Sequence, residues 1–134
     1  MQRFAWSVFG LIALTALVPA KDDKPSEIKE IMLKANKTGT GLYANVVTEL
    51  RQDDPMWDAV KKDTKEIARL AAMVSKYDPP KGDKDSWQKL TKAYAENTKA
   101  LADAAAQMDK DAAKAVSEKI TKSCEVCHMA HRKQ

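Results

Sequence analysis

Apolar residues recur every three or four positions along most of the chain beyond residue 20, which is the spacing of one helix face. The first such segment covers residues 26–50, with Ser26 as its N-cap. Its glycines at positions 39 and 41 allow a kink or the close approach of a neighbouring group. The inner face of this helix is predicted to carry Ile28, Ile31, Met32, Ala35, Gly39, Leu42, Tyr43, Val46 and Leu50.

Three further helices follow the same pattern. The second begins with Asp54 as N-cap and Pro55 in the first helical position, and it ends before a loop at 78–85 that contains Pro and Gly. The third helix continues to Met108, and the fourth follows a short turn at 109–111. Their predicted inner faces are Trp57, Val60, Thr64, Ile67, Ala71 and Val74; then Trp87, Leu90, Tyr94, Asn97, Leu101, Ala104 and Met108; and finally Ala113, Val116, Ile120, Cys124, Cys127 and His131.

Short connections between consecutive helices predict an all-α, antiparallel up-down-up-down four-helix bundle. The end of the last helix then lies level with the start of the first helix, the end of the second and the start of the third. Residues 28–35, 70–77 and 87–94 are therefore expected to surround it, with Trp87 and Leu90 as pocket wall.

Residues 1–20 have a different character, with one basic residue, Arg3, followed by an apolar run from 4 to 18 and by Pro19 and Ala20. This pattern predicts a signal peptide that is cleaved after Ala20, leaving one domain at 21–134. The run is shorter than the roughly 18 residues that a spanning helix needs. We therefore expect no stable membrane insertion after cleavage, and a periplasmic location.

The charges exclude some functions. The chain has 23 Lys and Arg against 19 Asp and Glu, a formal net charge of +4. Both signs are interspersed along every segment, which is typical of solvated helix faces and gives no reason to expect a nucleic-acid partner. No acid pair or nucleophile with a base stands out by spacing, so we expect no enzyme.

The strongest chemical signal is the motif C-x-x-C-H formed by Cys124, Cys127 and His128. It is typical of c-type haem attachment. Each thiol can join one vinyl group of a single porphyrin, and the adjacent histidine is then held under the iron as proximal ligand. The sequence therefore predicts one covalent haem c.

Three other interpretations of the cysteines are a redox dithiol, a structural disulfide and a zinc site. A redox dithiol of the thioredoxin type would follow a strand, and no strand pattern precedes Cys124. Structural zinc usually draws its ligand pairs from two separated segments, whereas Cys124, Cys127, His128 and His131 lie within one short run. A non-haem helical bundle with a zinc site or a disulfide remains an alternative.

The motif and the residues that follow it resemble the class II c-type cytochromes, meaning cytochrome c prime and its low-spin relatives. The family pattern is C-x-x-C-H, two residues, usually an aromatic residue, then a basic one. His131 takes the aromatic position here and Arg132 the basic one. The resemblance implies that both residues line the proximal pocket or bind a haem propionate.

The resemblance also implies a distal residue on the first helix, which corresponds to Met32. In the low-spin relatives a methionine there binds iron, while in cytochrome c prime a non-coordinating residue leaves the position open to NO or CO. We expect Met32 to be the distal ligand, with Met73 as the fallback. The alternative, in which Met32 only packs against the porphyrin, stays open.

The expected function is that of a periplasmic mono-haem electron carrier that docks with redox protein partners. The alternative is a five-coordinate haem protein that binds NO or CO, and the position of Met32 relative to the iron separates the two. The resemblance also allows a homodimer.

Overall fold

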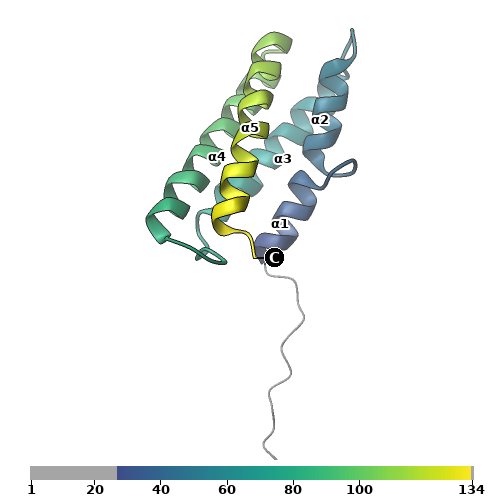
Figure 1. The fold of residues 1–134 in the computed structure, drawn as a ribbon. Helices are drawn as coiled ribbons and strands as arrows, with labels where there is room; N and C mark the ends of the chain where they lie inside the picture. The colour runs from purple at the N-terminus through teal and green to yellow at the C-terminus, as the bar shows by residue number, and fades with distance from the viewer. Residues whose placement is uncertain (1–26, 134) are drawn as a thin grey trace, which may run out of the picture.

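The computed structural model describes residues 27–133, so the predicted signal peptide and the N-cap Ser26 lie outside the described residues. The described part contains five helices and no strand (Figure 1). They are α1 (Glu27–Asn36), α2 (Leu42–Arg51), α3 (Trp57–Val74), α4 (Lys84–Ala106) and α5 (Lys110–His131). The predicted all-α fold is confirmed.

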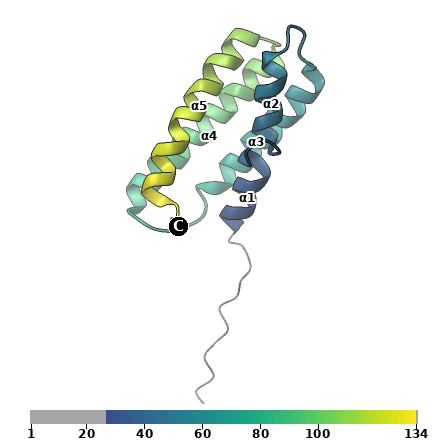
Figure 2. The same cartoon turned by 45° about the vertical axis from the view of Figure 1, so that its right-hand side comes forward.

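The helices follow the predicted up-and-down order, with α1 and α2 together in the place of the first helix. Figures 1 and 2 show the end of α5 at the same end of the bundle as the start of α1. Helix α3 packs against α4, α4 against α5, and α2 against both α3 and α5. Helix α1 packs on α2 and α3, but none of its Cα atoms lies within 8 Å of one in α4 or α5.

The prediction of one continuous helix over 26–50 is wrong, because the helix stops at Asn36 and resumes at Leu42. Gly39 adopts a left-handed φ of 77°, which favours glycine. The N–H of Gly41 donates to the Lys37 carbonyl at 2.7 Å, and a Cβ on Gly41 would lie 2.5 Å from the Lys37 nitrogen. The turn therefore has no room for a Cβ at Gly41, whereas Gly39 is favoured by its backbone angle alone.

The second helix also starts later than predicted, at Trp57 rather than at Pro55. The backbone N–H of Met56 donates to the carboxylate of Glu49 at 3.0 Å, and Pro55 is buried. This bond ties the connecting segment back to α2, so the helical turn forms only after it.

The inner face of α4 is rotated relative to the prediction. Its buried residues are Trp87, Thr91, Thr98, Leu101, Ala104 and Ala105. Thr91 and Thr98 can be buried because their hydroxyls donate to carbonyls one turn back, those of Trp87 and Tyr94, at 2.8 and 3.0 Å. Met108, predicted to face inward, is exposed.

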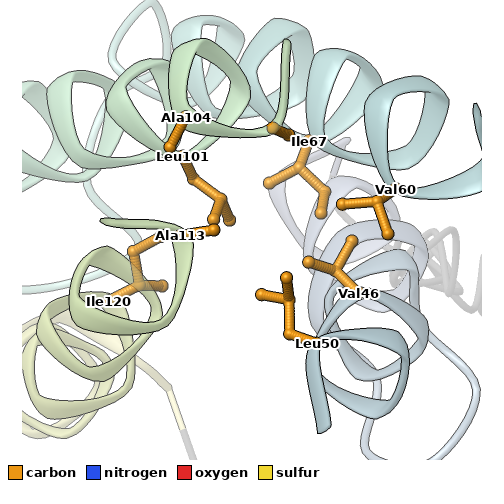
Figure 3. Packing of buried hydrophobic residues seen from close by; sticks show 9 residues of the cluster. Val46, Leu50, Val60, Ile67, Leu101, Ala104, Ala113 and Ile120 are labelled. Carbon is orange, nitrogen blue, oxygen red and sulfur yellow. The ribbon is translucent and has the colours of Figure 1, made fainter. Parts of the chain in front are cut away.

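The core divides into two apolar clusters along the bundle. The central cluster joins α2, α3, α4 and α5, and its side chains point toward one another in Figure 3. It consists of Val46, Leu50, Val60, Ile67, Leu101, Ala104, Ala105, Ala113 and Ile120. The second cluster, here called the motif cluster, has the buried residues Ile31, Ala35, Leu70, Val74 and Trp87. It lies at the end of the bundle where α5 finishes and α1 begins.

Within residues 27–133, no helix combines the length and the apolar character needed to cross a membrane.

Candidate cofactor site

The two cysteines lie on the last turns of α5 and face the bundle. Helix α5 starts at the N-cap Asp109, whose carboxylate accepts the N–H of Ala112 at 2.9 Å, and it continues without a break to His131. A spacing of three places Cys124 and Cys127 on the same helix face. Both are half-buried: Cys124 packs against the central cluster and Cys127 against the motif cluster. The C-x-x-C pair therefore spans the junction between the two clusters.

Both thiols are free and have raised pKa values. The main cause is burial, and for Cys127 the nearby Cys124 adds to it. Reactive dithiols of redox enzymes have lowered thiol pKa values instead. The surroundings of Cys124 and Cys127 are thus unlike those of a redox-active dithiol.

His128 follows Cys127 on an exposed part of α5. Partial burial and the nearby charge of Arg132 lower its pKa. The ring is therefore mainly neutral near pH 7, which is the form that binds a metal ion. Arg132 itself is exposed and forms the C-cap, where its backbone N–H donates to the His128 carbonyl at 3.0 Å.

Met32 reaches the same region from α1. It is half-buried and packs against the motif cluster, as Cys127 does. Its sulfur accepts a hydrogen bond from Nδ2 of Asn36 at 3.5 Å, and the same Nδ2 donates to the hydroxyl of Tyr94 at 2.8 Å. Burial raises the pKa of Tyr94 to about 12, so its hydroxyl is neutral.

Met73, the fallback ligand, also packs against the motif cluster, from α3. Its sulfur accepts a hydrogen bond from the Arg69 guanidinium at 3.3 Å. The Arg69 side chain is 56% exposed. The sulfur of Met73 is thus engaged by a group at the surface, whereas that of Met32 is engaged by Asn36 inside the bundle.

Of the two predicted wall residues, only Trp87 belongs to the motif cluster. Its indole N–H donates to the Tyr77 carbonyl at 2.8 Å. Leu90 is half-buried and belongs to neither cluster, while Thr91 beside it is buried.

His131 is 2% exposed and engages the loop before α4. Its Nδ1 lies 2.9 Å from the Lys81 carbonyl oxygen and its Nε2 lies 3.1 Å from Oγ of Ser86. The ring meets Trp87 edge-on, with centroids 5.2 Å apart. Both ring nitrogens have protein partners, so this structure leaves neither of them for a propionate.

Sequence reasoning missed Asn36. It lies four residues after Met32, one turn along α1, and this spacing was the only signal of a contact between them. Its Oδ1 is buried and has no hydrogen-bond partner within the described part of the chain. A buried amide with one unsatisfied oxygen is uncommon in a core that serves packing alone.

The donor set fits a haem and does not fit zinc. Two thiols, an imidazole and a thioether are the groups that hold and ligate haem c. Between residues 27 and 133 no group of three or more His, Cys, Asp or Glu side chains could hold a metal ion, so the alternative zinc site is not assembled. No Cα atom of α1 lies within 8 Å of one in α5, so α1 approaches the motif through side chains of the motif cluster and not through close backbone contact.

Comparison with known proteins gives a family match for the last two helices. Residues 81–132 match the sequence model of the family described as Cytochrome C'. The matched part contains α4 and α5 up to the C-cap, and with them the whole C-x-x-C-H motif. No curated protein and no solved structure matches the chain.

Proposed function

We propose that this chain, whose residues 81–132 match the cytochrome c' family of class II c-type cytochromes, binds haem c and acts as an electron carrier. One observation carries the proposal: Met32 of α1 and Cys127 of α5 pack against the same cluster. A thioether thus stands in the cluster that receives the haem-binding motif. Methionine ligation favours electron transfer and raises the potential of haem iron.

We place one haem on Cys124 and Cys127 through thioether bonds. Each S–H adds across one vinyl group, so that sulfur joins one carbon and the proton the other. His128 is the proposed proximal iron ligand, because it directly follows Cys127 in the C-x-x-C-H motif. Arg132 is the candidate partner of a propionate, and His131 and Trp87 line the proximal side. The bound haem supplies a one-electron couple.

Met32 is the better candidate for the distal ligand than Met73. The Met32 sulfur has an uncharged amide as its partner inside the bundle, whereas the Met73 sulfur lies 3.3 Å from a guanidinium nitrogen of Arg69. A positive charge beside a thioether opposes its binding to a cation. This difference supports Met32.

The gas-binding alternative requires a distal position that Met32 does not fill. The contact of Met32 with the motif cluster places a thioether where it could fill that position, and a thioether bound to iron has to leave before NO or CO can enter. The location outside the cytoplasm rests on residues 1–20. Redox proteins with acidic docking faces are the proposed partners, since Lys119, Lys122, Arg132 and Lys133 are exposed near the motif.

Optical spectra of the exported protein test the ligand set. We expect a low-spin ferrous spectrum that carbon monoxide barely alters, together with a methionine-to-iron charge-transfer band in the ferric form. Met32→Leu should abolish the band and open the iron to carbon monoxide. Met73→Leu is the matched control, because it replaces a methionine of the same cluster, and it should leave the band in place. A high-spin parent spectrum that shifts readily with carbon monoxide would support the gas-binding alternative instead.

Mass spectrometry tests the covalent attachment. The denatured protein should begin at Lys21 and carry the added mass of one haem. Cys124→Ser and Cys127→Ser should each abolish the doubly attached product. Normal haem loading in both variants would refute thioether attachment at this motif.

A further inference from the structure

Asn36 and Tyr94 form a polar pair beside Met32 that packing alone does not explain. Nδ2 of Asn36 lies 3.5 Å from the Met32 sulfur and 2.8 Å from the Tyr94 hydroxyl. The three residues come from α1 and α4, whose Cα atoms are nowhere within 8 Å of each other in the described chain. The contact between Asn36 and Tyr94 therefore bridges these helices through side chains.

The orientation of the Asn36 amide follows from its partners. A thioether sulfur can only accept a hydrogen bond, so only the NH₂ end of the amide can bond to Met32. A tyrosine hydroxyl accepts from the same NH₂ group. Turned the other way, the amide would place its oxygen against the sulfur and lose that bond. The sulfur therefore sets the orientation of the amide, because the tyrosine hydroxyl could also donate to the amide oxygen. In this orientation the NH₂ group contacts both partners, and the oxygen has no partner among the described residues.

This orientation has an electrostatic consequence at Met32. The positive end of the N–H dipole points at the sulfur and withdraws electron density from its lone pairs. Oxidised haem carries one more positive charge than reduced haem, so a donor dipole at the axial sulfur disfavours the oxidised state. Burial strengthens the effect, because the local dielectric constant is low. Hydrogen bonds outside the ligand set are known to tune metal sites in this way.

We propose that Asn36, held by Tyr94, is a positioning residue for the Met32 thioether, and that its amide raises the reduction potential of the haem. The inference rests on the proposed ligation by Met32. The reduction potential of the haem is then tuned by a polar contact, that of Asn36 with Met32, in addition to the apolar surroundings. Tyr94 acts through Asn36, since the hydroxyl has its hydrogen bond with the amide.

Potentiometric titration of the full exported holoprotein tests the proposal. Asn36→Leu should lower the ratio of reduced to oxidised haem at a fixed potential about threefold to tenfold, as expected for the loss of one hydrogen bond. The tenfold limit corresponds to about 59 mV for a one-electron couple. The methionine charge-transfer band should persist, because the ligand itself is unchanged. Asn45→Leu is the control, since Asn45 is an exposed asparagine on α2.

Tyr94→Phe provides a second, milder variant that keeps the ring. It should lower the potential in the same direction but less. Its effect should largely vanish when Asn36 is already Leu, since both changes act on one bond network. Additive effects of the two substitutions would show that Tyr94 does not act through Asn36 and would overturn that part of the proposal.

The outcomes separate this inference from the proposed function. A parent protein whose charge-transfer band disappears in Met32→Leu, but whose potential is unmoved by Asn36→Leu, refutes the inference and leaves the ligation intact. A parent that lacks the band altogether refutes the ligation, and the inference with it. A raised potential in Asn36→Leu would also refute the inference, because the dipole would then act with the opposite sign.

Discussion

The central cluster and the motif cluster differ in the kinds of side chain that form them. The central cluster is aliphatic, and α2 is fastened to α5 beside it by the Tyr43 hydroxyl, which donates to the Ser117 carbonyl at 2.6 Å. The motif cluster is smaller, and an indole and thioethers take part in it, with an amide and an imidazole beside it. On that side α1 makes no close backbone contact with α5.

This contrast separates folding from cofactor binding. A closed aliphatic core gains stability from burial without any ligand. Polar and sulfur-containing groups are poorer core material but offer ligands and hydrogen bonds. We infer that the central cluster holds the bundle together while the motif cluster is adapted to the haem. The predictions below compare substitutions on the two sides.

Truncation of one buried leucine in each cluster should give the largest and most distinct effects. Leu101→Ala in the central cluster should lower the free energy of unfolding by about 2–5 kcal/mol, measured by urea denaturation, because a fully buried side chain leaves a cavity. Its haem spectrum should match that of the parent. Leu70→Ala in the motif cluster should alter the spectrum as well as the stability. Equal spectral changes in both variants would contradict a division of labour between the clusters.

A pair of glycine substitutions should give the next largest effect. Gly82 and Gly39 both adopt positive φ, 83° and 77°. A Cβ on Gly82 would lie 2.8 Å from the Ala130 carbonyl oxygen and 3.0 Å from Nδ1 of His131, whereas nothing lies within 4 Å of one on Gly39. Alanine at either site costs about 1–2 kcal/mol of left-handed strain. Gly82→Ala should cost more, because the end of α5 must also shift.

Urea denaturation of the two variants gives this difference directly. Gly39→Ala acts as the control for backbone strain, and the excess in Gly82→Ala reports the close approach between the loop and α5. The spectrum of Gly82→Ala should change, since the shift occurs at Ala130 and His131, two and three residues beyond His128. Equal losses of stability in Gly39→Ala and Gly82→Ala would mean that the loop around Gly82 moves to make room for the Cβ and that α5 keeps its position.

The sequence predicted the bundle and the motif because both are periodic or local. Helix order follows from apolar spacing, and Cys124, Cys127 and His128 are adjacent in the chain. The buried face of α4 was misjudged because Thr91 and Thr98 count as polar until their hydroxyls are seen to bond back to the helix. The break at 37–41 was suspected from the glycines, but its extent depends on the turn geometry at Gly41.

The parts of the site that sequence did not reveal depend on contacts between distant segments. His131 bonds the carbonyl of Lys81, fifty residues away, and Asn36 meets Tyr94 across 58 residues. The spacing of residues within one helix cannot predict partners that lie fifty or more residues away in the chain. The role predicted for His131, in the proximal pocket or on a propionate, came from its position in the family pattern. Its hydrogen-bond contacts with Lys81 and Ser86 depend on how the chain folds.

The smallest expected effect concerns how α1 is held on α3. Glu66 of α3 accepts hydrogen bonds from Arg69 at 2.7 Å and from Lys34 of α1 at 2.6 Å. These two bonds hold the pKa of Glu66 at about 2, below its ordinary value of 4.5. The hydrogen bond from Arg69 makes the larger contribution, and the bond from Lys34 follows. A lowered pKa in the folded state stabilises the fold above pH 4.5, and that contribution is lost as the pH falls toward 2.

Because the ion pairs are exposed to solvent, Glu66→Gln should cost less than about 1 kcal/mol at pH 7. It should also remove part of the loss of stability between pH 5 and pH 2, measured by urea denaturation at each pH. Asp103→Asn is the matched control, since it breaks the ion pair with Lys99 inside a single helix. Among the ion pairs of the described residues, those of α4 and of the loop before it do not join two helices, so acid should loosen α1 first. An undiminished acid dependence in Glu66→Gln would place the pH-sensitive contacts elsewhere in the bundle.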